Sequence, residues 1–115
     1  MSIDRINPGK RLSDAVAYGN LVFLAGHVSE RADASVYEQT KDCLAAIDAD
    51  LAAAGSDKSR LLTVQIWLTD IATWAEMNRA WDEWIDPANL PARATVEAKL
   101  ATPAYKVEIA GVAAR

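Results

Sequence analysis

The segment from Leu62 to Leu68 constrains the fold most, because its side chains alternate between two chemical classes. Every second residue is aliphatic, and the residues between them are Thr63, Gln65 and Trp67. A repeat of two is the side-chain period of a β-strand, so the segment is predicted to be a strand with one face in the core. Trp67 lies on the second face, which indicates that this face is covered too.

A helical segment precedes this strand. Ser35 and Glu38 have the spacing of a capping box, in which the hydroxyl and the carboxylate each bind a free backbone N–H group. Gly55 tolerates the left-handed conformation that ends many helices, so a helix is predicted from Ser35 to Gly55. Apolar or small side chains recur along it every three or four residues and predict one buried face: Val36, Thr40, Cys43, Leu44, Ile47, Leu51 and Ala54.

A second helical segment follows the strand. Thr73 and Glu76 repeat the capping-box spacing, and Pro87 ends the segment because the residue before a proline disfavours helical angles. The apolar stripe of this helix is rich in tryptophan and consists of Trp74, Met77, Trp81, Trp84 and Ile85.

Four further segments are predicted to be strands. Residues 11–18 and 21–25 flank a glycine–asparagine pair, which is typical of a hairpin. Residues 93–100 and 105–109 alternate again and are predicted to form a closing antiparallel hairpin. The order of strands, helix, strand, helix and strands indicates one α+β domain over residues 1–115, with both helices on one face of the sheet.

Charge and composition exclude several functions. The 115 residues include 12 Lys and Arg against 16 Asp and Glu, for a net charge of −4. Phosphate contacts require concentrated positive charge, so nucleic acid is not an expected partner. No apolar run approaches the length of about 18 residues that spans a bilayer, and no signal peptide is recognisable, so the expected location is the cytoplasm, away from membranes.

The chain has one cysteine and one histidine. Cys43 has no partner for an internal disulfide and lies on the predicted apolar stripe, where we expect it in the core. Together with His27 it cannot build a His/Cys zinc site, so no metal is expected.

Arg93 and Glu108 are the most informative polar pair. In the predicted closing hairpin they fall nearly opposite each other, and both point from the same face. One interpretation is a cross-strand ion pair. The other is a binding site, in which the planar guanidinium of Arg93 holds a ligand carboxylate through two parallel hydrogen bonds and Glu108 holds or deprotonates a water.

Several motifs together carry a resemblance to a known family. Residues 89–96, which read NLPARATV, are followed by the KVEI segment at 106–109. This combination resembles the C-terminal signature of the Rid family, the reactive intermediate deaminases also called the YjgF or UK114 family. Residues 19–26, 65–70 and 77–81 resemble its earlier strands and its second helix. The WDEW and YKVE segments are most similar to the YoaB-like branch.

The resemblance implies a chorismate-mutase-like fold and a homotrimer with clefts between its subunits. It implies hydrolysis of 2-imino acids to 2-keto acids and ammonia, which removes reactive products of pyridoxal-phosphate enzymes without a metal or cofactor. Arg93 matches the arginine that binds the substrate carboxylate, Glu108 the glutamate that orients the attacking water, and Asn78 an asparagine of the second helix. Gly26 and His27, at the end of a strand, are expected to line the substrate site, with His27 as a wall or a base.

The chain departs from the family pattern at two places. Many family deaminases carry a Gly-Pro-Tyr segment near the N-terminus, where this chain has residues 11–14, RLSD. The family often has a serine before the glycine of its third strand, where this chain has Ala25. These missing groups motivate an alternative, a non-catalytic module that binds small carboxylate metabolites such as keto acids.

Overall fold

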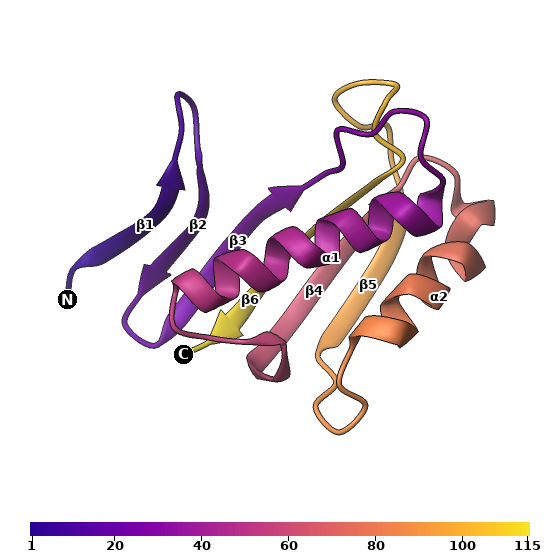
Figure 1. The fold of residues 1–115 in the computed structure, drawn as a ribbon. Coiled ribbons are helices and arrows are strands. Elements are labelled where there is room, and N and C mark those ends of the chain that lie inside the picture. Colours follow the sequence, from indigo (N-terminus) through magenta and orange to yellow (C-terminus); the bar gives the residue numbers. More distant parts are fainter.

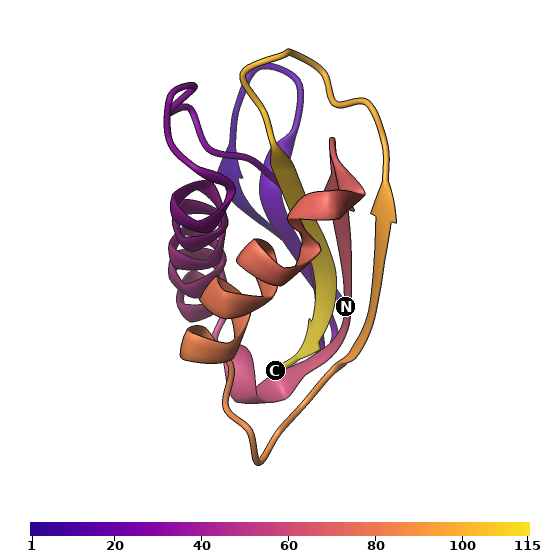
Figure 2. The same ribbon diagram turned by 90° about the vertical axis from the view of Figure 1, so that its right-hand side faces the viewer.

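One mixed sheet of six strands carries both helices of the chain on the same face (Figures 1 and 2). The computed structural model describes residues 1–115, with the strands in the spatial order β1-β2-β3-β6-β4-β5. No helix combines the length and hydropathy needed to cross a membrane. The elements are β1 (Ile3–Pro8), β2 (Ser13–Tyr18), β3 (Leu21–His27), α1 (Val36–Ala53), η1 (Lys58–Arg60), β4 (Leu61–Leu68), η2 (Ile71–Thr73), α2 (Trp74–Trp84), β5 (Ala92–Glu97) and β6 (Val107–Ala114).

Both ends of α1 lie where the sequence predicted them, but only the Ser35 half of the capping box forms, because the Glu38 carboxylate accepts from Arg31 instead. The Ser35 hydroxyl oxygen accepts a hydrogen bond from the backbone N–H of Glu38 at 3.1 Å. Gly55, just beyond the C-cap, has a φ of 82°, which favours glycine.

The predicted capping box of α2 is wrong. The Thr73 hydroxyl donates to the backbone carbonyl of Asp70 at 2.6 Å instead of capping the helix. The Glu76 carboxylate accepts from the backbone N–H of Tyr37 at 3.2 Å, which ties α2 to the start of α1. A 3-10 turn precedes α2 directly, and in it the hydroxyl and the backbone N–H of Thr73 both donate to the carbonyl of Asp70.

The core lies between the sheet and the two helices. It consists of 20 buried residues, to which β4 contributes Val64, Ile66 and Leu68, as the alternation predicted. Cys43 is fully buried, also as predicted, and burial raises the pKa of its thiol to about 12. Leu62 departs from the alternation and is exposed, because a register shift between β4 and β6 turns Leu61 inward in its place.

The predicted closing hairpin of β5 and β6 is wrong, because β4 lies between these two strands. β4 pairs with β6 antiparallel and with β5 parallel. Parallel neighbours need a crossover connection, and α2 supplies it between β4 and β5. Residues 98–106 then pass the end of β4 to reach β6 (Figure 2), held there by hydrogen bonds to the backbone of Leu68 and Thr69. A first strand, β1, was not predicted.

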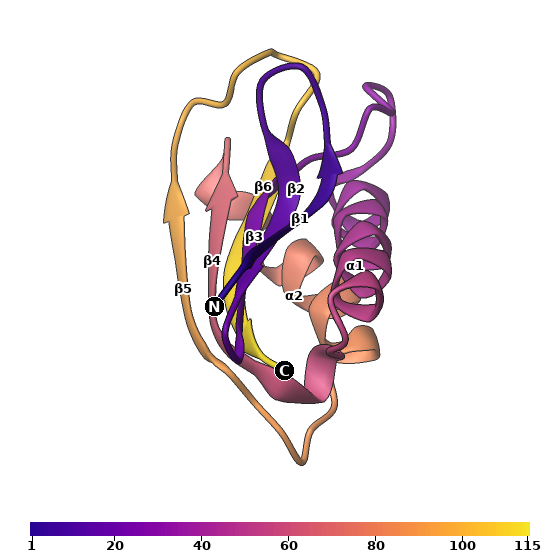
Figure 3. The ribbon, with the colours of Figure 1, turned by 90° about the vertical axis from the view of Figure 1, so that its left-hand side faces the viewer.

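The second face of the sheet carries no helix (Figures 2 and 3). Phe23 and Val96 are 45% and 49% exposed there. Trp67, in β4, lies opposite Val96 on one side and Glu108 on the other, so all three share this face. The single chain therefore leaves apolar sheet surface uncovered.

Candidate functional site

Arg93 projects from β5 toward the helices. Its register partner in β4 is Val64, a core residue, so its side chain shares the helix-covered face. The guanidinium carbon lies 5.1 Å from the centroid of the Trp81 ring, within the range of a cation–π interaction. Partial burial lowers the pKa of Arg93, and the charge of Asp82 partly opposes this effect. Arg93 joins none of the four ion pairs of the chain, so its planar fork is available to an anion.

α2 forms the wall beside this arginine. Asn78 lies one turn before Asp82 on the helix, and both line a depression of about 560 Å³ along α2. Arg93, Trp81, Asp82 and Asn78 are called the arginine side below. Trp81 and Asp82 were not predicted as site residues, because the helical period does not show which strand the tryptophan stripe meets. Arg93 itself lines none of the five depressions of the single chain.

Glu108 projects from β6 toward the open face of the sheet. Its register partner is Trp67, and its carboxylate joins none of the chain's ion pairs. The carboxylate lies against Gly26 of β3, where a Cβ atom would collide with Oε2 of Glu108. The structure therefore brings together Gly26 and Glu108, two predicted site residues, and gives a steric reason for the glycine.

His27 lies beside Gly26 at an irregular end of β3, where the register with β6 shifts between Leu24 and His27. Its Nδ1 atom lies 2.6 Å from the carbonyl oxygen of Ala25, and its Nε2 atom lies 2.5 Å from Oδ2 of Asp50 in α1. The ring is only 9% exposed. His27 was predicted to line the cleft or act as a base, and both of its nitrogens are engaged within the chain.

A depression of about 470 Å³ adjoins these residues, with three carboxylates and no lysine or arginine in its lining. The Tyr105 hydroxyl donates to Glu30 at its edge, across 3.4 Å. The charge of Glu30, partial burial and the charge of Glu108 raise the pKa of Tyr105. Neither Tyr105 nor Glu30 was predicted as a site residue, and the strand predicted from residue 105 begins only at Val107. The depression, with Glu108, is called the glutamate side, and its lining is Leu12, Asp14, Gly26, His27, Val28, Glu30, Ala46, Ala49 and Asp50.

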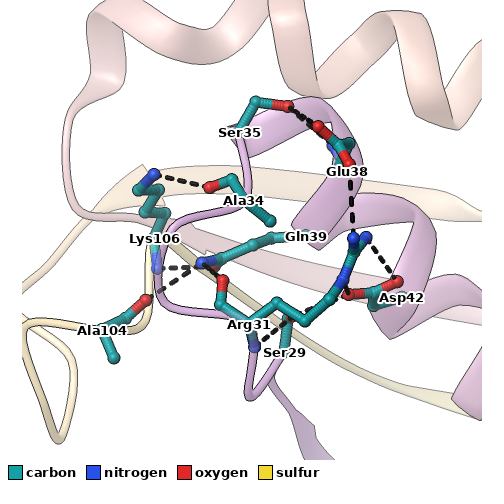
Figure 4. Close-up of polar contacts among 9 residues, drawn as sticks. All are labelled: Ser29, Arg31, Ala34, Ser35, Glu38, Gln39, Asp42, Ala104 and Lys106. Atoms are coloured by element: carbon teal, nitrogen blue, oxygen red, sulfur yellow. Dashed lines mark hydrogen bonds and ion pairs between the residues drawn. The ribbon is translucent and has the colours of Figure 1, made fainter.

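Two loops at this end of the sheet are held by one buried side chain, Gln39 (Figure 4). Its amide nitrogen donates to the carbonyl oxygens of Arg31 at 2.9 Å and Ala104 at 3.0 Å. Its amide oxygen accepts from the backbone N–H of Lys106 at 2.9 Å. Gln39 thus fixes the segment that leads into β6 two residues before Glu108.

Arg93 and Glu108 do not meet within one chain, so the predicted cross-strand pair is wrong. Their register partners, Val64 and Trp67, stand three residues apart in β4 and point to opposite faces of the sheet. An ion pair between these two side chains is therefore excluded in the single chain, and so is a joint site built by one chain alone.

Comparisons with known proteins agree with this architecture. The sequence matches the model of the family described as Endoribonuclease L-PSP over residues 2–115. A RutC family protein of Haemophilus influenzae is 51% identical over 98% of both chains, and the RutC family protein YoaB of Escherichia coli is 46% identical over 99% of both. A crystal structure of a YjgF family member from Neisseria meningitidis, 44% identical, superposes with a TM-score of 0.96 over 100% of this chain and 96% of the other.

The fold is that of the YjgF proteins, an α+β sheet with two helices on one face. The chain belongs to this family, also called the Rid or RutC family.

Proposed function

We propose that the protein hydrolyses reactive 2-imino acids to 2-keto acids and ammonia at a site shared between subunits. Arg93 of one subunit binds the substrate carboxylate, and Glu108 of a neighbouring subunit handles the attacking water. One observation carries the proposal: the two residues lie on opposite faces of the sheet, and neither has an ionic partner within the chain.

The uncovered face of the sheet supports an assembly of several copies. Glu108 shares that face with Trp67 and Val96, so an interface between copies that covers this apolar surface also brings Glu108 to the interface. β5 is one of the two edge strands, and it carries Arg93 at the margin of the sheet. A closed homotrimer in which the edge of one subunit meets the open face of the next joins the arginine side to the glutamate side.

The charges of the two sides match the two ends of a protonated imino acid. The guanidinium of Arg93 accepts the carboxylate as a planar fork. The carboxylates Asp14 and Glu30 line the depression on the other side, Glu108 lies against Gly26 of the same lining, and these negative charges favour the positively charged C=N group. Shelter between subunits strengthens both interactions, because the effective dielectric constant falls as water is excluded.

The reaction then needs one water and one base. Glu108 accepts a proton from the water while the water oxygen bonds to the imine carbon. The C=N π electrons move to the nitrogen. Glu108 returns the proton to the nitrogen of the resulting carbinolamine, the C–N bond breaks, and ammonia leaves as the hydroxyl loses its proton to form the ketone. General acid–base assistance of this kind contributes roughly 10²- to 10⁴-fold.

A coupled assay tests the proposal. A threonine dehydratase generates 2-iminobutyrate, and semicarbazide traps whatever the protein has not hydrolysed. Arg93→Ala should slow hydrolysis about 30-fold or more, since the loss of one partner of a sheltered charge pair costs roughly 2–5 kcal/mol. Arg60→Ala is the matched control, because Arg60 is exposed in η1 and lines none of the depressions. Equal rates for the wild type and Arg93→Ala would refute the assignment.

A binding module without turnover is the second candidate. It is favoured by the lining of the glutamate side, which contains no side-chain hydroxyl and in which both nitrogens of His27 are engaged. Calorimetry with 2-ketobutyrate distinguishes the two: saturable binding in a protein that leaves the imine untouched supports the module, and turnover excludes it.

A further inference from the structure

His27 and Asp50 form a buried contact that the proposed reaction does not use directly. Their side chains are 9% and 7% exposed, and the two atoms in contact lie 2.5 Å apart. The Ala25 carbonyl oxygen can only accept, so Nδ1 of His27 is the donor in that bond. Nε2 and the Asp50 carboxyl then share one hydrogen between them. Both nitrogens of the imidazole are held by partners within the chain, which suits a structural role better than that of a mobile base.

The contact closes a short loop of backbone. Nδ1 of His27 donates to the carbonyl oxygen of Ala25, and this hydrogen bond closes a loop of backbone that contains Gly26. Asp50 anchors this backbone loop to α1. The second carboxylate oxygen of Asp50 lies 3.5 Å from Nδ2 of the Asn7 side chain in β1. The irregular end of β3 is thereby attached to two other elements of the fold.

The backbone loop at Ala25–His27 supports the carboxylate of Glu108. Gly26 lies directly against this carboxylate, and no ion pair holds Glu108 from another side. The position of Glu108 therefore depends on the backbone of Gly26, which depends in turn on His27 and Asp50. A misplacement of about 1 Å in a reacting group costs on the order of 100-fold in rate.

We propose that His27 and Asp50 are positioning residues, which hold the Ala25–His27 segment in the shape that places Glu108 for its water. The inference rests on the proposed function. Their loss should lower kcat and leave KM nearly unchanged, because Arg93 binds the substrate carboxylate from a different subunit.

Three variants of α1 test the role in the imine assay. Asp50→Ala removes the anchor and should lower kcat about 10- to 100-fold, with KM changed less than about threefold. Asp50→Asn keeps the shape, since its amide can donate to Nε2 while Nδ1 still donates to Ala25, and should stay within about fivefold of the wild type. Asp48→Ala is the matched control, because Asp48 accepts one hydrogen bond from Trp84 at a different place on the same helix.

A fourth variant covers poor folding of Asp50→Ala, which leaves His27 buried without its partner. The double variant His27→Phe/Asp50→Leu removes both polar groups at once, a replacement that is often close to neutral for stability. It should bind 2-ketobutyrate in calorimetry as the wild type does and should have the same low kcat as Asp50→Ala.

The outcomes separate this inference from the function on which it rests. Wild-type turnover together with an unchanged kcat in Asp50→Ala, or in the double variant, overturns the positioning role and leaves the deaminase proposal standing. Equal losses in Asp50→Asn and Asp50→Ala also overturn it, because the charge of Asp50 would then be what matters. A wild type that does not hydrolyse the imine overturns both.

Discussion

The arginine side and the glutamate side are built in contrasting ways. Arg93 stands on a regular strand and packs on Trp81 of a regular helix. The charge of Asp82 acts on its guanidinium. Glu108 rests on a glycine in an irregular strand end, which a buried His27–Asp50 contact holds in place, while Gln39 fixes the segment that leads into β6. Under the proposed function the regular side would bind the substrate carboxylate and the irregular side would position the water.

The contrast is sharpest if the two sides come from different subunits. Arg93→Ala and Glu108→Gln should each be nearly inactive, yet their co-expression should recover activity, because each mixed trimer contains one site with both native residues. Random mixing of three subunits regenerates about a quarter of the wild-type sites. The measurement is imine hydrolysis by purified mixed trimers, with each variant alone as control. Mixed trimers no faster than either variant would overturn the shared site.

Gly26→Ala should damage the glutamate side while sparing the arginine side. The new methyl group would collide with Oε2 of Glu108 and displace the carboxylate from the irregular end of β3. We expect kcat to fall about 10- to 100-fold, and binding of 2-ketobutyrate to change much less. Gly9→Ala is the control, since its Cβ would meet only the Leu12 carbonyl oxygen at 3.5 Å. A Gly26→Ala protein with native kcat would separate the glycine from catalysis.

Trp81→Phe should have the opposite signature. Phenylalanine keeps an aromatic surface under the guanidinium, which lies 5.1 Å from the Trp81 ring, but its cation–π attraction is weaker. A loss of about 0.5–1 kcal/mol predicts a KM raised about two- to fivefold with little change in kcat. Steady-state kinetics provide the check, alongside thermal unfolding to exclude a general loss of packing. A fall in kcat alone would contradict a role confined to carboxylate binding.

The smallest effect concerns the loop that follows β3. The Arg31 guanidinium, aided by Ser29, holds the pKa of Asp42 below its ordinary value (Figure 4). A depressed carboxyl pKa stabilises the fold above the unfolded value, near pH 4, and this contribution disappears as pH falls through the folded value. The pair is exposed to solvent, which screens the two charges, so its contribution is small.

Urea unfolding of the wild type and Asp42→Asn measures this contribution. The free energies of unfolding should differ at pH 7, and the difference should shrink as the pH falls below about 4. Asp33→Asn, in the loop that carries Arg31, is the control. A constant difference at both pH values would assign the effect to something other than the ionised carboxylate.

Local patterns were sufficient for a large part of this fold. The alternation around Val64 and Ile66 identified the central strand, and the Ser35 cap and Gly55 bounded the first helix as the structure has them. Each of these features depends on residues a few positions apart, and the same is true of the burial of Cys43. The family motif that singled out Arg93 and Glu108 is likewise a matter of residue type and spacing.

The amino-acid sequence by itself determined both helices and every strand except β1, which of their faces are apolar, and which side chains carry the charges. Only the tertiary structure decided that β4 separates β5 from β6, and hence that Arg93 and Glu108 face opposite ways. The physical reason is that alternation describes the two faces of one strand, whereas the choice of a neighbouring strand depends on hydrogen bonds between distant segments. Here the α2 crossover, packed on the core through Met77 and Trp81, carries β5 to the outer edge of the sheet.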